Sequence, residues 1–496
     1  MDNQLSIFDV MYPKYKIIKP IRLIEFFAGY GSQALALKYL GVPFEHWKIC
    51  EWAIKSIQAY KDIHFTNDNE DYSMLNNLSY EKLIDILYNY GISQNYNEPM
   101  TLEQIKRLGE NQVRKIFNNI VATHNLVNIQ KVKGYSLEIE DTDKYDYILT
   151  YSFPCQDLSL AGKGKGMSDT STRSGMLWEV ERILSECKEL GTMPQVLLME
   201  NVPQVHGIDN VQDFNKWQLR LEELGYKNYF QDLIATDYGI PQTRNRCFMV
   251  SILGDYSYTF PKSIPLKLKL KDMLEENVDE KYYLSDKQIN CLSSQKEYDN
   301  GYIRGKQFKK NINPKVATTL TASSSDRASD TFIAIKNATK KGYLEATDGD
   351  GIDISSRMEH HRGNVQKDRI QTITTSGGND RGVVVNMKTE LCNNLIKEGK
   401  VKENDVIRHN YTTSKNGDCI QGHNEAPTLD TRCDCLGVVN NMRIRKLTPK
   451  ECFRLMGVKD EDFEKCAKNQ SDSSLYHLAG DSIVVNVLMA IFKEMI

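Results

Sequence analysis

One cysteine stands where a nucleophile can act. Cys155, flanked by Pro154 and Gln156, directly follows the apolar run 147–151, which predicts a β-strand. Ligands bind at the carboxyl ends of parallel strands, and a thiolate there can attack an electrophilic carbon when neighbouring groups lower its pKa. A lone cysteine is more often a buried structural residue. By itself, the position of Cys155 is compatible with either role.

Two other predicted strands adjoin groups that can share protons or hold anions. Glu200 closes the apolar run 196–199, where partial desolvation raises the pKa of a carboxyl group and suits it for proton sharing. Arg244 and Arg246 precede a strand predicted over 247–252. Because they are two residues apart on an extended segment, they point to one side, where they can hold a carbonyl, a phosphate or a carboxylate.

A glycine-rich turn follows the first predicted strand, 23–27. Gly29 and Gly31 let the backbone approach a ligand closely, and the helix that follows offers its N-terminus to negative charge. Glu51 ends the second predicted strand, where an acid can accept hydrogen bonds from ribose hydroxyls. The turn and the acid together indicate a nucleoside-type cofactor.

In their order along the chain, these blocks resemble those of the bacterial and phage cytosine-C5 DNA methyltransferases. The ordered set is far more specific than any one block. The matching blocks are Phe-x-Gly-x-Gly from Phe27, Pro-Cys-Gln around Cys155, Glu-Asn-Val from Glu200, Gln-x-Arg-x-Arg from Gln242, and the segments 443–451 and 479–483.

The resemblance implies a mechanism. Carbon 5 of cytosine is a poor nucleophile until a covalent adduct forms at carbon 6, and Cys155 would make that adduct. Glu200 would hold the N3 proton and the amino group, and Arg246 would contact O2. The other residues of the implied catalytic set are Arg244, which would help to order the site, and Pro154 and Gln156. Because the ring is unreachable inside a duplex, the base must be flipped out.

The resemblance also implies S-adenosylmethionine as the methyl donor. The residues expected to line its pocket are Phe27, Ala28, Gly29, Gly31, Glu51, Trp52, Asn128, Ile129 and Ser482. Asn128, on a predicted strand 126–129, stands where the family usually has an aspartate, and Asp481 stands where it usually has an asparagine. No metal site is expected, because the grouping of Cys419, His423, Cys433 and Cys435 does not have zinc-site spacing.

Alternating predicted strands and helices indicate an α/β fold with a mostly parallel sheet covered on both faces. We expect a Rossmann-like S-adenosylmethionine-dependent methyltransferase domain over 20–260, preceded by an N-terminal arm, 1–19. A helical insertion of open function is expected over about 66–125. It contains a helix over 80–90 and another from Thr101, with a capping box to Gln104 and an apolar stripe reaching Ile120.

A smaller, loop-rich target-recognition domain is expected over 261–442, with double-stranded DNA as the partner. The net charge of the chain is −3, yet nine lysines and arginines accompany two acids between Gly301 and Tyr343. This stretch can hold phosphates, although a solvated surface is the alternative. Thr-rich segments within 315–432 form either a degenerate repeat or a coincidence of similar loops. Residues 443–496 return to helix, and their apolar face is expected to pack on the catalytic domain.

The bulk composition is that of an ordinary globular protein. The chain has 496 residues, of which 40% are hydrophobic and 26% charged. It has no apolar run of about 18 residues and no secretory leader pattern, so we expect a cytoplasmic protein without a membrane span. Its eleven scattered cysteines indicate free thiols. We expect a monomer that acts in a restriction-modification system or as an orphan or phage enzyme.

Three other functions are alternatives. An exocyclic-amine methyltransferase would carry Asn/Asp-Pro-Pro-aromatic where this chain has Phe153-Pro154-Cys155. An RNA cytosine methyltransferase shares the block order, but the long variable domain favours DNA. A DNA-binding protein without activity would tolerate loss of Cys155 or Glu200, and both are present.

A short N-terminal segment indicates a further partner. The residues Gln4 to Phe8, Gln-Leu-Ser-Ile-Phe, resemble the peptide by which bacterial proteins dock on the replication sliding clamp. Such peptides act from mobile tails. The alternative is an N-terminal arm that packs on the catalytic domain.

Overall fold

The computed structural model describes residues 12–154, 174–283 and 442–496, and shorter stretches between them at 307–308, 310–320, 327, 330–336, 351–353, 365–366, 381–383, 405–408 and 419–423. The chain divides into two compact units. Unit 1 comprises Met1–Glu275, Lys315–Asp326 and Thr448–Ile496, and unit 2 comprises Glu276–Pro314 and Arg327–Leu447.

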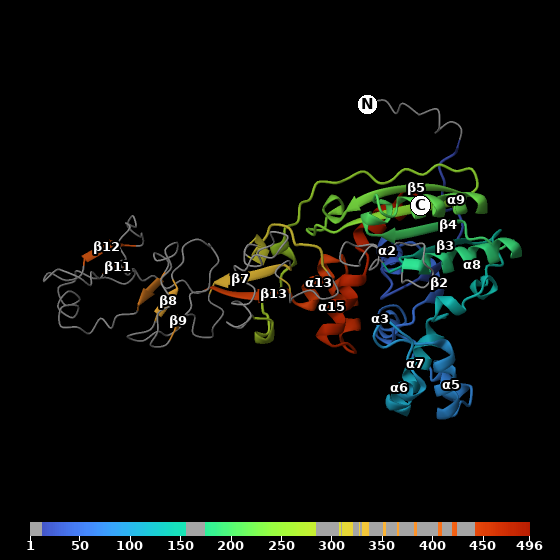
Figure 1. The fold of residues 1–496 in the computed structure, drawn as a ribbon, viewed down its shortest axis with the longest axis horizontal. Coiled ribbons are helices and arrows are strands. Elements are labelled where there is room, and N and C mark those ends of the chain that lie inside the picture. The colour runs from blue at the N-terminus through green and yellow to red at the C-terminus, as the bar shows by residue number, and fades with distance from the viewer. Residues whose placement is uncertain are drawn as a thin grey trace. The chain divides into compact units, whose positions relative to one another are not determined.

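Unit 1 is built on a six-stranded sheet in the order β2-β1-β3-β4-β6-β5 (Figure 1). The strands are β1 (Ile21–Phe26), β2 (Phe44–Cys50), β3 (Asp146–Tyr151), β4 (Val196–Asn201), β5 (Tyr226–Ile234) and β6 (Asn245–Leu253). The first four are mutually parallel, and β6 runs antiparallel to both β4 and β5. Every residue of β3 and β4 is buried, as expected for central strands covered on both faces. The predicted α/β fold with a mostly parallel sheet is confirmed.

Helices cover this sheet. They are α2 (Ser32–Leu40), α3 (Ile54–His64), α8 (Leu177–Leu190), α9 (Val211–Leu224), α13 (Pro449–Leu455), α14 (Asp460–Ala467), α15 (Asp472–Asp481) and α16 (Val485–Lys493). In α9 the side chains of Phe214, Trp217, Leu221 and Leu224 are buried, as their spacing predicts. The apolar face of α16 packs against α2, and Thr448–Ile496 belongs to unit 1, whereas β13 (Met442–Lys446), at the start of the expected C-terminal return, belongs to unit 2.

Short 3-10 turns join these elements. They are η1 (Ile129–Lys131), η2 (Gly134–Leu137), η3 (Ser174–Met176), η4 (Pro203–His206), η5 (Ala235–Tyr238), η6 (Leu270–Met273) and η7 (Glu280–Tyr282).

A helical lobe interrupts the alternation after α3. It contains α4 (Tyr72–Leu75), α5 (Tyr80–Tyr90), α6 (Leu102–Arg107) and α7 (Glu110–Ala122), and Figure 1 shows α5, α6 and α7 gathered at one end of unit 1. The apolar faces of α5, α6 and α7 form a core of their own. The capping box between Thr101 and Gln104 is confirmed. The single helix expected from Thr101 to Ile120 is wrong, because Gly109 adopts φ +77° and ends α6 before α7 begins.

The strand predicted over 126–129 is also wrong. Among the described residues, 126–129 form no β-bridge, and the preceding Asn125 makes only an isolated bridge with Ile49. Val127 has φ +64°, which breaks the extended conformation, and Ile129 already belongs to η1. The segment is therefore a loop beside the end of β2.

The described strands of unit 2 are short. β13 (Met442–Lys446) pairs antiparallel with β7 (Phe332–Lys336). A small sheet contains β8 (Gly351–Asp353), β9 (Val365–Gln366) and β10 (Arg381–Val383), and β11 (Asp405–Arg408) pairs with β12 (Cys419–His423). Most residues of the predicted repeat and of the basic stretch lie outside the described residues.

One stretch, Asp472–Lys493, has the length and apolar composition of a membrane-crossing helix, with a mean hydropathy of 1.6. In the structure it consists of the two helices α15 and α16, and 72% of its apolar window is buried inside the fold. Such burial is typical of a core segment. Length and apolar composition are therefore weak evidence for a membrane span.

Candidate active site

Several of the predicted site residues that the structure describes lie at the carboxyl edge of the parallel strands. The register places Phe26, the last residue of β1, opposite Cys50 of β2 and Tyr151 of β3, and Tyr151 opposite Met199 of β4. The turn after β1, Glu51, the segment after β3 and Glu200 therefore leave the sheet side by side. This edge is where ligands bind in open α/β sheets.

Cys155 and Gln156 lie outside the described residues, but the backbone leading to Cys155 is described. Phe153 is buried, and its carbonyl accepts a hydrogen bond of 3.0 Å from the side-chain nitrogen Nδ2 of Asn201. Asn201 is the last residue of β4 and directly follows Glu200. The end of β4 is thus hydrogen-bonded to the segment that carries Pro154. This link was not predicted from the sequence.

Glu200 is a buried acid whose carboxyl group can accept a further hydrogen bond. Its side chain is only 9% exposed, and Nε of Arg246 lies 3.1 Å from its Oε1. Oε1 makes no hydrogen bond to any residue that the structure describes. Burial raises the pKa of Glu200, although the charges of Arg246 and Arg244 oppose that shift. Burial therefore makes the protonated form of this carboxyl group easier to hold than that of an exposed glutamate.

Arg244 has a different environment from Arg246. It is 5% exposed and donates hydrogen bonds to three carbonyls, those of Leu320 at 3.0 Å, Gly480 at 3.1 Å and Ser482 at 2.7 Å. The sequence predicts that these arginines hold a carbonyl, a phosphate or a carboxylate. In the structure, Arg244 binds carbonyls and Arg246 faces a carboxylate. Arg244 joins the start of β6 to two distant segments of unit 1.

The glycine turn after β1 has one crowded and one open glycine. A Cβ atom at Gly31, which has φ +82°, would lie 2.4 Å from Nε2 of His64. A Cβ atom at Gly29, which has φ +56°, would meet nothing within 4 Å. Gly31 is therefore required by packing, whereas the backbone at Gly29 borders open space into which a ligand can approach.

Glu51 closes one side of that space. Its Oε2 accepts a hydrogen bond of 3.0 Å from the amide of Gly29, and its Oε1 accepts one of 2.8 Å from the amide of Ala53. Burial raises the pKa of Glu51 to about 7, despite these backbone donors. A carboxyl group held in this way still has lone pairs for hydroxyl donors.

The other predicted cofactor residues occupy several kinds of position. Ala28 and Ile129 are buried, Phe27 and Trp52 are partly buried, and the hydroxyl of Ser482 donates to the carbonyl of Leu478. The side-chain oxygen of Asn128 accepts from the amide of Gln130 at 3.0 Å and caps η1. That oxygen is therefore already engaged with the backbone.

Strained backbone gathers around the same edge. Phe27, Val127 and Tyr96 have φ values of +56°, +64° and +64°, which residues with side chains rarely adopt. Phe27 belongs to the turn after β1, Val127 pairs with the end of β2 through Cys50, and Tyr96 belongs to the helical lobe. Such strain concentrates at functional sites.

One grouping among the described residues has metal-ligating atoms close together. The ligand atoms of His206, Asp232 and Cys247 lie within 4.8 Å of one another, and Nε2 of His206 is 2.9 Å from Oδ1 of Asp232. Burial, with the nearby charges of Asp232 and Glu200, raises the pKa of the Cys247 thiol. The geometry is that of a histidine–aspartate hydrogen bond beside a protonated core thiol.

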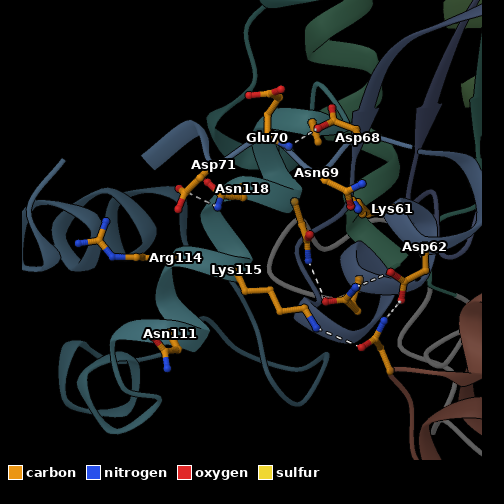
Figure 2. Close-up of a pocket in the computed structure, with 14 residues that line it drawn as sticks. Lys61, Asp62, Asp68, Asn69, Glu70, Asp71, Asn111, Arg114, Lys115 and Asn118 are labelled. Carbon is orange, nitrogen blue, oxygen red and sulfur yellow. Dashed lines mark hydrogen bonds between the residues drawn. The ribbon is translucent and has the colours of Figure 1, made fainter. Parts of the chain in front are cut away.

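A polar pocket of about 390 Å³ lies between α3, α4 and α7 and includes none of the predicted site residues (Figure 2). Its side chains bond mainly to one another: Asp62 accepts from Gln58 at 2.7 Å and from Asn469 at 3.0 Å, and Lys115 donates to Asn469 at 3.2 Å. This chain of bonds links the helical lobe to the C-terminal segment, which is a structural role.

Comparison with known proteins identifies the family. The family described as C-5 cytosine-specific DNA methylase matches residues 105–496. The chain is 30% identical over 482 residues to the type II methyltransferase M2.ScrFI of Lactococcus lactis subsp. cremoris, covering 96% of this chain and 99% of that protein. It is 36% identical over 271 residues to the orphan methyltransferase M.SssI of Spiroplasma monobiae, covering 54% of this chain and 68% of that protein.

A solved structure supports the fold. The crystal structure of a Spodoptera frugiperda DNMT2 mutant superimposes with a TM-score of 0.51 at 16% identity, covering 96% of this chain and 99% of that one. The chain therefore belongs to the family of C-5 cytosine-specific DNA methylases, and it is a cytosine methyltransferase.

Proposed function

We propose that the chain transfers a methyl group from S-adenosylmethionine to carbon 5 of a flipped-out cytosine in a specific double-stranded DNA sequence, through a covalent adduct with Cys155. The observation that carries this proposal is the edge of the sheet where the segment leading to Cys155, the buried Glu200 and Arg246 lie together. Nucleophile, proton-sharing acid and cation are the three groups that this chemistry needs.

The reaction begins with the Cys155 thiolate, which forms a bond to carbon 6 of the ring. The electron pair of the 5,6 double bond moves to carbon 5 while protonated Glu200 stabilises the ring at N3 and the amino group. Arg246 contacts O2 and offsets the charge that develops there. Carbon 5 would then form its new bond to the methyl group while the bond from that methyl group to the sulfonium sulfur breaks, which leaves a neutral thioether. A base removes the carbon-5 proton, the double bond returns, and the Cys155 thiolate leaves.

S-adenosylmethionine supplies an activated methyl group on a sulfonium, and the residues after β1 and β2 suit a molecule of this kind. Gly29 borders open space, and Glu51 can accept hydrogen bonds from ribose hydroxyls. Trp52, which is partly buried against the helical lobe, is proposed to pack on the adenine. The remaining residues proposed to line the pocket are Phe27, Ala28, Gly31, Asn128, Ile129 and Ser482. For Asn128 the free amide nitrogen is the proposed contact, because its oxygen caps η1.

Unit 2 is proposed to contain the target-recognition residues. Its basic stretch would hold phosphates, and its Arg, Lys, Asn and Gln side chains would read base edges. The enzyme is proposed to act as a monomer in the cytoplasm, within a restriction-modification system or as an orphan enzyme.

Base-resolution mapping of methylated cytosines in a host that expresses the chain tests this proposal. We expect 5-methylcytosine within one short sequence context in wild type and none with Cys155→Ala. Methylation on another atom, methylation of RNA but not DNA, or activity that survives Cys155→Ala would contradict it.

A second proposal concerns Gln4 to Phe8, which lie outside the described residues. We propose that this segment docks on the bacterial sliding clamp. Pull-down with purified clamp should recover wild type and lose the Leu5→Ala/Phe8→Ala variant. Equal recovery of both would refute the proposal without affecting the methyltransferase assignment.

A further inference from the structure

A loop of the helical lobe reaches the edge of the sheet where the cofactor is proposed to bind. The amide of Ser93 donates to the carbonyl of Trp52 at 2.8 Å, and the carbonyl of Ser93 accepts from the amide of Ile54 at 2.9 Å. The residues directly after Glu51 are thus held along this loop. The lobe is therefore part of the wall beside the proposed pocket.

The same loop contacts helix α15 of the C-terminal segment. The ring of Tyr96 stacks on His477 of α15, with centroids 4.1 Å apart and planes 17° from parallel. Nδ1 of His477 lies 2.8 Å from Oδ2 of Asp481, which directly precedes Ser482. Tyr96 adopts its strained backbone, with φ +64°, while making this contact. The arrangement holds the imidazole beside the Asp481 carboxylate.

Asp481 brings a second carboxylate into the surroundings of Glu51, whose pKa is raised mainly by burial and also by the charge of Asp481. S-adenosylmethionine has a sulfonium cation, whereas the product, S-adenosylhomocysteine, has a neutral sulfur. Negative charge near the pocket therefore favours the donor over the product. His477 can cancel this charge, since the adjoining Asp481 raises the pKa of the imidazole and favours its charged form.

We propose that Asp481 is a specificity-determining residue that makes the cofactor pocket prefer the cationic methyl donor over the neutral product. His477, held by Tyr96, is the counter-ion that switches this preference off as the imidazole becomes protonated. The inference rests on the proposed cofactor site. It gives the helical lobe a role, because Tyr96 positions the counter-ion. The preference is strongest above the pKa of His477.

Other ionisable groups in the neighbourhood must be distinguished from Asp481. Glu51 and Tyr96 lie on the side of the helical lobe, Cys466 on α14 also faces Tyr96, and Arg244 binds the carbonyl of Gly480. Glu51 titrates near pH 7 and itself favours a cation when charged. At pH 8.5 Glu51 is ionised with or without the charge of Asp481, so comparing wild type with Asp481→Asn at that pH isolates the carboxylate of Asp481.

The test is calorimetric measurement of Kd for S-adenosylmethionine, S-adenosylhomocysteine and an analogue with an ammonium in place of the sulfonium, at about pH 6 and pH 8.5. For Asp481→Asn at pH 8.5 we expect the preference for both cationic ligands over S-adenosylhomocysteine to fall about fivefold, or ~1 kcal/mol. At pH 6 the two proteins should have nearly the same preference. The side chain of Asp481 is 56% exposed, so solvent screening keeps the expected factor modest.

Two control variants separate charge from structure. Glu461→Gln changes an exposed acid on the preceding helix, α14, and should leave the preference unchanged at both pH values. Tyr96→Ala should shift the pH at which the preference appears. Equal weakening of all ligands in Asp481→Asn, or an unchanged preference at pH 8.5, would overturn the inference. Failure of wild type to bind any of these ligands would instead refute the proposed cofactor site.

Discussion

The Nε atom of Arg246 lies 3.1 Å from Oε1 of Glu200 across the antiparallel strands β6 and β4. The guanidinium lowers the cost of ionising a buried carboxyl group, yet leaves that oxygen without a hydrogen bond among the described residues. A polar group buried in this state costs stability unless a ligand completes it. The pair is thus suited to a polar substrate edge such as that of cytosine.

Replacing Glu200 by Gln should separate catalysis from stability. The amide cannot share the N3 proton, so we expect kcat to fall by about 10²- to 10⁴-fold. The melting temperature should stay level or rise at neutral pH, because burial disfavours the ionised carboxyl group. Methyl transfer from labelled donor and thermal unfolding measure the two effects. Glu222→Gln, an exposed change on α9, is the control, and a fully active Glu200→Gln protein would refute the role.

Alanine substitutions of the two arginines should affect stability and activity differently. Arg244→Ala removes the donors of three buried carbonyls, so the free energy of unfolding should fall by at least about 2 kcal/mol. Arg246→Ala should change stability by less than about 1 kcal/mol but weaken cytosine binding and turnover. Urea unfolding and steady-state kinetics distinguish the variants. Equal destabilisation by both would show that Arg246 is also structural.

Alanine at the two turn glycines provides a matched pair. Gly31→Ala places a Cβ atom 2.4 Å from His64, so the fold should be destabilised whether or not cofactor is present. In Gly29→Ala the new Cβ atom lies in open space, so the only expected loss of stability is the left-handed backbone cost of about 1–2 kcal/mol. We expect Gly29→Ala to stay folded and to lose at least about tenfold in affinity for S-adenosylmethionine. Unchanged affinity would place the cofactor elsewhere.

Glu51 should make stability depend on pH. Its pKa in the folded chain is raised to about 7, so its favourable contribution is complete below its unfolded pKa and is lost as pH rises through 7. Glu51→Gln should therefore flatten the decline of unfolding free energy between about pH 5 and 8, by about 1–3 kcal/mol. Urea unfolding at several pH values measures this.

Glu25 is the matched control for that experiment. It is buried in β1, its pKa is also raised to about 7 by burial, and it accepts hydrogen bonds from Tyr60 and Ala34. Glu25→Gln should flatten the pH profile in the same direction but retain cofactor affinity, whereas Glu51→Gln should lose it. If both variants bind cofactor like wild type, Glu51 is not a cofactor ligand.

Much of this organisation could be predicted from local sequence pattern. The helix Tyr80–Tyr90, the capping box at Thr101 and the buried stripe of α9 each follow from residues within one or two turns of each other. The order of the catalytic blocks identified the family. The edge strand β5 was not predicted, because its exposed residues give it no clean alternation.

The sequence by itself determined which residue types stand at each strand end, because apolar runs define the strands and the chain order defines the blocks. Only the tertiary structure decided which of them meet. Arg244 binds carbonyls from residues 320, 480 and 482, and Tyr96 of the helical lobe stacks on His477. Val127 and Gly109 interrupted elements that periodicity had made continuous. These contacts join residues far apart in the chain, and packing selects them by summed burial and hydrogen bonding, which local pattern does not encode.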